Sequence, residues 1–235
     1  MGVPAALTRR AFPLKSCSPN RVMEGNLGPW VPSASYTCPV PSLIAIPLAL
    51  VASYLLGSVS FGILVATSRG VDIRSEGSGN PGASNIMRVL GKRAAVVVLI
   101  GDGLKGAVAA GIGVVVASPE FGYVTLLAAL VGHTFPIWHG FKGGKSVATG
   151  LGGIIYLAPL VGLLLGMLWI AMVLVWKTAS IASITVMVLL VPALWIGDRA
   201  DAELLWAAVI TLFVFVRHAD NIKRLFASNE RKVTG

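Results

Sequence analysis

Long apolar runs alternate with short polar segments along most of this sequence of 235 residues. From residue 43 onward each run is long enough to form a helix, and the charged residues gather in the gaps. A helix that crosses the hydrocarbon core of a bilayer needs about 20 predominantly apolar residues. The pattern therefore predicts an all-α, polytopic membrane helix bundle. We expect about seven transmembrane helices, at residues 43–67, 94–117, 121–138, 146–157, 159–176, 181–197 and 203–217.

One apolar stretch, residues 146–176, is too long for one ordinary span and short for two. Gly152 and Gly153 lie inside it, and Pro159 follows Ala158 near its middle. Proline disfavours the helical conformation in the residue before it. We therefore predict two helices that form a hairpin and separate at Pro159.

Basic residues are distributed unevenly over the connections between these helices. With seven helices, thirteen Lys and Arg residues fall on one side and Arg199 alone falls on the other. Cytoplasmic loops carry the Lys and Arg excess, so the basic side and the C-terminus are predicted to be cytosolic and the N-terminus external. The tail before the first helix nevertheless carries four basic residues. Either the topology tolerates this tail, or the natural start is the internal Met23.

The first 42 residues differ from the rest of the chain. They are rich in Pro, Ser and Arg and contain no apolar run, so they are not a secretory signal peptide. We predict a disordered tail at residues 1–42 and a single membrane-embedded domain at residues 43–235. Cys17 and Cys38 lack the CxxC spacing of a metal or redox site, and no metal site is expected.

Composition agrees with a membrane protein. Apolar residues make up 55% of the chain and charged residues 12%, whereas soluble domains carry roughly 25% charged residues. The net charge of +9 is compatible with a nucleic-acid partner. However, the basic residues lie beside the predicted spans, where lipid phosphates and topology explain them. We therefore expect no nucleic-acid partner.

The first polar cluster, residues 75–93, reads SEGSGNPGASNIMRVLGKR. Its glycines allow the backbone to approach a ligand closely, and arrays of N–H groups beside a helix N-terminus bind phosphate. Ser78, Ser84 and Asn85 can add hydrogen bonds, and Arg88 can hold an oxyanion through two N–H groups. The alternative is a mobile cytoplasmic loop whose arginines only set the topology.

The second cluster, residues 132–150, reads GHTFPIWHGFKGGKSVATG and places a Lys–Gly–Gly–Lys turn directly before an apolar helix. Glycines admit an anion and lysine neutralises it, as in a phosphate-binding loop, but the full GxxxxGK[ST] spacing is not present. The alternative is that the two lysines anchor a helix end at the lipid headgroups. His133 is expected to be a structural helix histidine.

Two shorter clusters follow. Ser180 and Ser183 lie three residues apart on one predicted helical face, although serines in membrane helices commonly bond to their own backbone. His218 and Asn221 lie three residues apart after the last span, on one face of a helix. A basic juxtamembrane helix is the alternative interpretation of this last segment.

One ionisable pair falls inside a predicted span. Asp102 and Lys105 are three residues apart, and such residues within a membrane mark functional sites or neutralise each other structurally. The four polar clusters share the predicted cytosolic side. Together they indicate a phosphorylated substrate taken from the cytosol, without naming a reaction.

Several of these segments, in order, resemble motifs of the bacterial acyl-phosphate:glycerol-3-phosphate acyltransferase family of membrane-integral enzymes. GSVSFG at 57–62 resembles GSIPFG, and SGNPGASN followed by Arg88 resembles SGNPGATN followed by arginine. GHTFPIWHGFKGGKSVAT resembles GHxFPxFxxFKGGKGVAT, TASIASI resembles a serine-rich segment, and RHADNIKRL resembles H-R-x-N-I-x-R-L. The resemblance runs from about Leu55 to Lys232.

The resemblance implies a seven-helix enzyme of the bacterial inner membrane with its active site facing the cytosol. Such an enzyme transfers an acyl chain from acyl phosphate to the 1-position of sn-glycerol 3-phosphate, giving lysophosphatidic acid and phosphate, the first step of phospholipid synthesis. The implied partners are glycerol 3-phosphate, acyl phosphate, membrane lipid and the enzyme that makes acyl phosphate, with no cofactor. By motif position, the implied catalytic residues are Ser78, Arg88, Lys145, Ser183, His218 and Asn221. The implied substrate-binding residues are Gly79, Asn80, Gly82, Ser84, Asn85, Lys142, Gly143, Gly144 and Ser180.

The chain departs from the family pattern at three positions. Ser60 stands where the first motif has proline, Ser146 replaces the glycine after the second lysine, and Thr178 stands where an aromatic residue is common. The chain also lacks the HxxxxD motif of other acyltransferases. The main alternative function is a transporter or flippase of a small phosphorylated solute. The gathering of the polar clusters on one membrane face counts against it.

The distribution of basic residues generates a topology prediction. A reporter fused after Gly235 is expected to read as cytoplasmic, and a reporter in the turn at residues 198–202 as external, because basic connections remain inside. Fusions to alkaline phosphatase and to green fluorescent protein at both sites measure this directly. A periplasmic signal at the C-terminus would contradict the hairpin split at Pro159.

Overall fold

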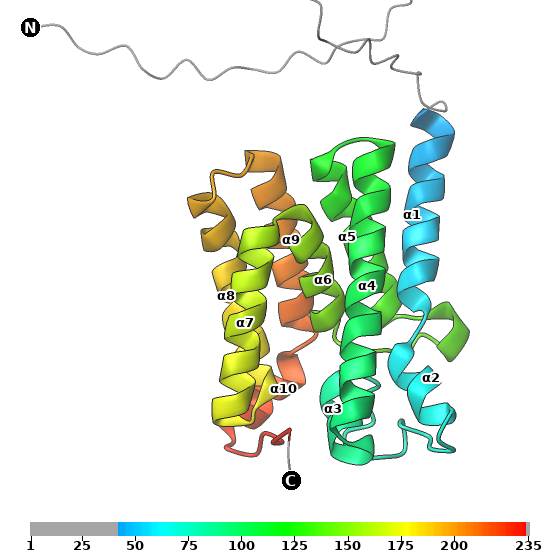
Figure 1. Cartoon of the computed structure of the whole chain (residues 1–235), viewed down its shortest axis with the longest axis vertical. Coiled ribbons are helices and arrows are strands. Elements are labelled where there is room, and N and C mark those ends of the chain that lie inside the picture. The colour runs from blue at the N-terminus through cyan, green and yellow to red at the C-terminus, as the bar shows by residue number, and fades with distance from the viewer. Residues whose placement is uncertain (1–41, 234–235) are drawn as a thin grey trace, which may run out of the picture. The chain divides into compact units, whose positions relative to one another are not determined.

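The computed structural model describes residues 42–233, and every regular element in this part of the chain is a helix (Figure 1). The longer helices are α1 (Ser42–Ser58), α4 (Lys92–Val116), α5 (Pro119–Thr134), α6 (Val147–Leu157), α7 (Pro159–Trp176), α8 (Ala179–Ile196) and α9 (Asp201–Val216). The shorter ones are α2 (Phe61–Thr67), α3 (Ala83–Leu90), the 3₁₀ turn η1 (Ile137–His139) and α10 (Ala219–Phe226). Apart from Ser42, the predicted N-terminal tail lies outside the described residues.

The predicted helix break at Pro159 is confirmed. α6 ends at Leu157, Ala158 leaves the helical region with φ −140° and ψ 76°, and Pro159 occupies the first turn of α7. Proline is well suited to a first turn because its missing N–H has no partner there in any case.

The first predicted helix, residues 43–67, is interrupted, because α1 ends at Ser58 and α2 begins at Phe61. Ser60 is extended, with φ −98° and ψ 99°, and its hydroxyl accepts a hydrogen bond from the Ile63 N–H at 3.4 Å. In a continuous helix this N–H would bond to the carbonyl of Val59. The break therefore leaves the Val59 carbonyl free, and it accepts a hydrogen bond from Lys105 Nζ at 2.7 Å instead.

Two helices lie in segments without an apolar run. α3 falls within the first polar cluster, and α10 falls within the segment after the last span. Both are short and strongly amphipathic, so a search for long apolar runs does not detect them.

Five helical stretches are long and apolar enough to cross a membrane: Leu43–Thr67, Lys92–Val116, Pro119–His139, Pro159–Trp176 and Ala179–Ile196. α9 qualifies only together with α10, as a pair bent by 57°. α6 corresponds to a predicted span but has 11 residues, which extend about 16 Å at 1.5 Å per residue. The described chain is thus a membrane helix bundle with five or six candidate spans, fewer than the seven predicted.

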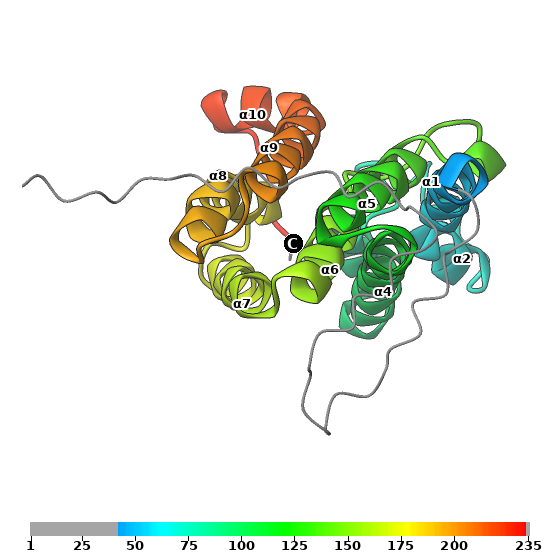
Figure 2. The same cartoon turned by 90° about the horizontal axis from the view of Figure 1, so that it is seen from above.

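α4 occupies the centre of one half of the bundle, where it packs against α1, α2, α3, α5 and α6. α7, α8 and α9 form the other half, and α6 lies between the halves (Figure 2). α3, α10 and the C-terminal end of the described chain lie at the same end of the bundle (Figure 1). Polar clusters far apart in sequence therefore meet at one end.

Glycines allow α4 and α6 to approach each other closely. A Cβ atom on Gly152 would lie 2.0 Å from the Gly103 carbonyl oxygen, and one on Gly106 would lie 1.9 Å from the Thr149 carbonyl oxygen. Small residues have this function in many membrane helix pairs, where packing rather than water exclusion holds helices together.

The α4–α6 contact generates a stability prediction. Gly152→Ala forces the two backbones apart, and we expect it to destabilise the protein by about 1–3 kcal/mol. Gly103→Ala is the matched control, because its Cβ would make an ordinary contact of 3.7 Å with the Ala148 carbonyl oxygen. Thermal unfolding in detergent measures both variants. Equal melting temperatures for the two would show that this contact is not tightly packed.

Candidate active site

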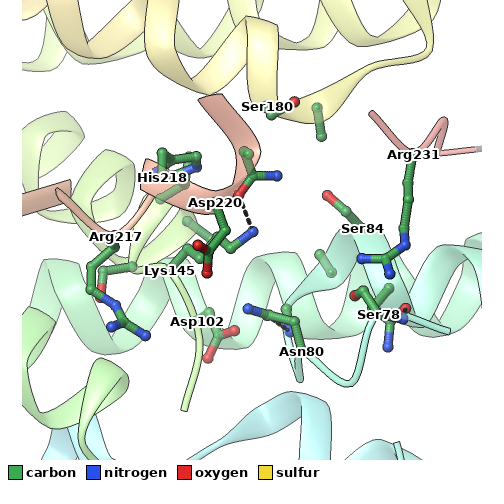
Figure 3. A pocket seen from close by; sticks show the side chains of 18 of the residues that line it. Ser78, Asn80, Ser84, Asp102, Lys145, Ser180, Arg217, His218, Asp220 and Arg231 are labelled. Carbon is green, nitrogen blue, oxygen red and sulfur yellow. Dashed lines mark hydrogen bonds between the residues drawn. The ribbon is translucent and has the colours of Figure 1, made fainter. Parts of the chain in front are cut away.

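A cavity of about 330 Å³ lies where the polar clusters meet (Figure 3). Its walls come from the loop before α3, from α3 and α4, from the segment before α6, from the start of α8 and from the α9–α10 junction. Ten of the fifteen residues implied by the family resemblance line it: Ser78, Asn80, Gly82, Ser84, Asn85, Arg88, Lys145, Ser180, His218 and Asn221. The cavity thus joins four motifs that are up to 143 residues apart, from Ser78 to Asn221.

Asn85 organises the loop that precedes α3. Its Oδ1 accepts hydrogen bonds from the Ser78 N–H at 2.8 Å and from Arg88 Nη1 at 3.3 Å, and its Nδ2 donates to the Glu76 carbonyl at 3.0 Å. The side chain is 2% exposed. Asn85 therefore shapes the site by holding Ser78 and Arg88, while its own amide is largely occupied by protein groups.

The C-terminal segment, residues 228–233, folds back toward the cavity. Arg88 Nε donates to the Lys232 carbonyl at 2.6 Å, and the Val233 N–H donates to the Lys177 carbonyl at 2.6 Å. Arg231 from this segment lines the cavity (Figure 3). The last described residues are therefore part of the site wall.

A chain of side-chain contacts connects Lys145 to this segment. Lys145 Nζ donates to Asn221 Oδ1, and Asn221 Nδ2 donates to Glu230 Oε1 at 2.7 Å. Glu230 Oε2 accepts from Arg224 Nε at 2.9 Å. Because Glu230 takes the donor end of the Asn221 amide, the acceptor end faces Lys145.

Lys145 lies in an electropositive, partly buried position outside the membrane-spanning helices. Burial, together with the positive charges of Arg224, Arg217 and Arg88 and against the opposing charge of Glu230, lowers the pKa of its ammonium group to about 8. A phosphate bound beside Lys145 would favour the charged ammonium and raise its pKa again. The position therefore suits a group that neutralises an anion.

His218 lies at the junction between α9 and α10. Its Nδ1 is 2.8 Å from the Val214 carbonyl. A carbonyl only accepts, so Nδ1 carries the proton, and Nε2 of the neutral ring keeps its lone pair. His218 lines the cavity, where such a nitrogen can accept a hydrogen bond from a substrate hydroxyl.

The two serines of α8 differ in position. Ser180 lines the cavity, whereas Ser183 does not. The Ser183 hydroxyl donates to the Ala179 carbonyl at 2.7 Å and accepts from Trp169 Nε1 at 3.0 Å. Trp169 itself lines the cavity, so Ser183 affects the wall through the orientation of this indole.

Gly79, Lys142, Gly143 and Gly144 also do not line the cavity. The Gly143 N–H donates to the Thr134 carbonyl at 3.0 Å, and the Gly144 N–H donates to the His133 carbonyl at 3.0 Å. The N–H groups of these two implied substrate-binding residues are thus bonded to the end of α5. The glycines also permit close packing, since a Cβ on Gly144 would lie 2.1 Å from His133 Nε2.

Several charged residues of the cavity were not expected from the sequence. Arg217, Arg224, Glu230 and Arg231 line it. For the three arginines, a position on the predicted cytosolic side also fits a purely topological role, so only the fold distinguishes the two roles. Arg217 additionally lies over the Phe135 ring, 5.3 Å from its centroid.

A buried ionic cluster borders the cavity. Lys105 Nζ lies 2.8 Å from Asp102 Oδ1 and 2.8 Å from His133 Nδ1. All three side chains are almost fully buried, and Asp102 and His133 line the cavity. No group of three His, Cys, Asp or Glu side chains suited to a metal ion occurs among residues 42–233.

Comparison with known proteins places this geometry in a family. A family model described as glycerol-3-phosphate acyltransferase matches residues 47–228. A glycerol-3-phosphate acyltransferase of Mesorhizobium japonicum is 42% identical over 190 residues, covering 79% of this chain and 95% of the relative. One from Aquifex aeolicus is 39% identical over 186 residues, covering 77% of this chain and 95% of the relative.

Two crystal structures of PlsY, an integral membrane glycerol 3-phosphate acyltransferase, also resemble the chain. The glycerol 3-phosphate form is 38% identical with a TM-score of 0.76, and the lysophosphatidic acid form is 38% identical with a TM-score of 0.74. Each match covers 80% of this chain and 95% of the solved one. The chain therefore belongs to the glycerol-3-phosphate acyltransferase family of integral membrane proteins.

Proposed function

We propose that this acyltransferase moves an acyl chain from acyl phosphate to the 1-position of sn-glycerol 3-phosphate, giving lysophosphatidic acid and phosphate. The observation that carries the proposal is the charge of the cavity. Its basic side chains are Arg88, Lys145, Arg217, Arg224 and Arg231, and its acidic ones are Asp102, Asp220 and Glu230. Both proposed substrates are anionic, and a partly dehydrated cationic cavity binds such groups more strongly than water-exposed cations do.

An apolar hollow adjoins the cavity and supports a substrate with an acyl chain. It has a volume of about 90 Å³ and shares Ala83, Ser84, Leu99 and Trp169 with the cavity. Its other walls are Met87, Ala95, Val96, Val173 and Val233. A phosphate in the cationic cavity and a chain in the apolar hollow match the two ends of acyl phosphate.

The proposed reaction needs no covalent enzyme intermediate. The 1-hydroxyl oxygen of glycerol 3-phosphate attacks the acyl carbonyl carbon, the bond from that carbon to the phosphate oxygen breaks, and phosphate leaves with the electron pair. The hydroxyl proton passes to the departing phosphate, while His218 Nε2 and the Ser78 and Ser180 hydroxyls orient the attacking group. Arg88 and Lys145 stabilise the negative charge that develops on the carbonyl oxygen and the phosphates.

The proposed setting is the cytosolic face of the bacterial inner membrane, with the N-terminus external and the C-terminus cytosolic. α6, which begins two residues after Lys145, would act as a short seventh crossing. The acyl chain would then remain in lipid while the phosphate reaches water. The enzyme that makes acyl phosphate is the expected upstream partner.

The donor is the first point to test. We expect purified protein to acylate glycerol 3-phosphate with palmitoyl phosphate and to give no product with palmitoyl-CoA. The chain lacks an HxxxxD pair to activate the hydroxyl against a thioester, and acyl phosphate already has a good leaving group. Product formation is followed by mass spectrometry of lysophosphatidic acid. Robust acyl-CoA turnover would refute the donor assignment, and uptake of a phosphorylated solute without turnover would support a transporter.

The ionisation of Lys145 predicts a pH dependence. The charged ammonium binds phosphate and has a pKa of about 8 in the empty site, so kcat/KM for glycerol 3-phosphate should fall as the pH rises through about 8. The second pKa of a phosphate group is about 6, so the substrate charge does not change in this range. We expect Lys145→Arg to lower kcat/KM about tenfold or more at pH 7, because a planar guanidinium does not replace a compact ammonium.

The same variant should lose the alkaline fall, since a guanidinium stays charged over the whole pH range of the assay. Lys92→Arg, at an exposed position outside the cavity, is the matched control and should keep the wild-type profile. An unchanged alkaline fall in Lys145→Arg would assign the titration to another group.

A further inference from the structure

Lys105 holds three parts of the bundle together through one ammonium group. Its Nζ contacts the Val59 carbonyl at 2.7 Å, Asp102 Oδ1 at 2.8 Å and His133 Nδ1 at 2.8 Å. The ammonium makes hydrogen bonds with the Val59 carbonyl and His133 Nδ1 and an ion pair with Asp102, whose Oδ1 accepts no hydrogen bond within the described part of the chain. The three groups belong to the α1–α2 break, α4 and the end of α5.

His133 connects this cluster to the segment that carries Lys145. Because the Lys105 ammonium only donates, His133 Nδ1 must accept, and the proton of the neutral imidazole lies on Nε2. That edge of the ring packs against Gly144, where a Cβ atom would lie 2.1 Å from Nε2. The residue next to Gly144 is Lys145.

The end of α5 also makes hydrogen bonds with the two residues that flank Lys145 in the sequence, Gly144 and Ser146. The His133 carbonyl accepts from the Gly144 N–H at 3.0 Å. On the other side, the Ser146 hydroxyl lies 2.8 Å from Thr134 Oγ1 and donates to the Leu130 carbonyl at 2.9 Å. Ser146 itself has a positive φ of 63°, a conformation that needs such support in a residue other than glycine.

We propose that Asp102, Lys105 and His133 form a positioning cluster that fixes the end of α5, and thereby places the Lys145 ammonium for binding the phosphate of glycerol 3-phosphate. Lys105 and His133 are positioning residues in this scheme, since they act through Gly144 and Lys145. The inference rests on the proposed function of Lys145 as a phosphate-binding group. Positioning of Lys145 would give the ionic cluster a function inside an otherwise apolar bundle.

Two substitutions of His133 separate positioning from simple packing. Asparagine can place its Oδ1 near the position of Nδ1 and so still accept from Lys105, whereas glutamine extends toward the position of Nε2 and leaves Lys105 without that acceptor. We expect His133→Gln to raise KM for glycerol 3-phosphate about tenfold or more, because displacements of about 1 Å are sufficient for such losses. His133→Asn should keep a KM for glycerol 3-phosphate close to that of the wild type.

Coupling to Lys145 is the second readout. If His133 acts through Lys145, then Lys145→Arg should have a much smaller effect in the His133→Gln background than in the wild type. Additive effects of the two substitutions, or equal effects of His133→Asn and His133→Gln, would reduce the cluster to packing. Thr125→Ala serves as the control on the same helix, since the Thr125 hydroxyl bonds only to backbone carbonyls within α5.

Asp102→Asn keeps the proposal testable if the His133 variants do not fold, because it has the same shape. Removing a negative charge from the cavity wall would by itself improve binding of an anion and lower KM. Positioning predicts the opposite, since a weakened Lys105 contact displaces Lys145 and raises KM. A lower KM in Asp102→Asn would overturn the inference.

Binding of glycerol 3-phosphate is also measured without any acyl donor, as the rise in melting temperature on adding the ligand. Wild-type protein that neither binds nor acylates glycerol 3-phosphate would refute the proposed function. Wild-type protein that does both, with His133→Gln and Asp102→Asn showing the same ligand-induced rise, would refute the positioning cluster alone.

Discussion

Polar groups inside an apolar bundle must find their partners within the protein, and the architecture of the site follows from this requirement. An unpaired buried charge is strongly destabilising, whereas one with complete hydrogen bonding can be retained. Lys105 meets the requirement with two hydrogen bonds and an ion pair, to groups of three elements. Around the cavity, Asn221 and Glu230 do the same for Lys145 and Arg224. The cavity has more cationic than anionic side chains, which leaves attraction available for a ligand.

Much of the bundle was predictable because lipid imposes a simple pattern on sequence. The helices from α4 to α9 correspond to apolar runs, and the α6–α7 break follows from the restriction that Pro159 places on Ala158. The interruption between α1 and α2 was less accessible. It depends on the Ser60 hydroxyl and on Lys105, which is 45 residues away in sequence. Local helix propensity cannot predict a contact between residues so far apart in the sequence.

In the site, too, the sequence indicated residues within local motifs but not the contacts between residues that are distant in sequence. Ten of the fifteen residues that the motifs implied line the cavity, since phosphate-binding side chains recur in recognisable patterns. Gly143 and Gly144 were assigned to the anion for their small size, but their N–H groups bond to the end of α5. Small size suits both close ligand approach and close packing, and only the neighbours in space distinguish them. Glu230 was missed because nothing near it in sequence reveals its contact with Asn221.

The attachment of the C-terminal segment has a consequence for how this region can diverge among related sequences. Arg88 contacts the carbonyl of Lys232, and Lys177 offers its own carbonyl to the N–H of Val233. Both bonds use the main chain of the segment, so they tolerate almost any side chain at position 232. They do not tolerate a change in length between α10 and this point, because the register of the backbone would shift. Insertions and deletions here should therefore be rarer than substitutions, even though the segment lies at the very end of the fold.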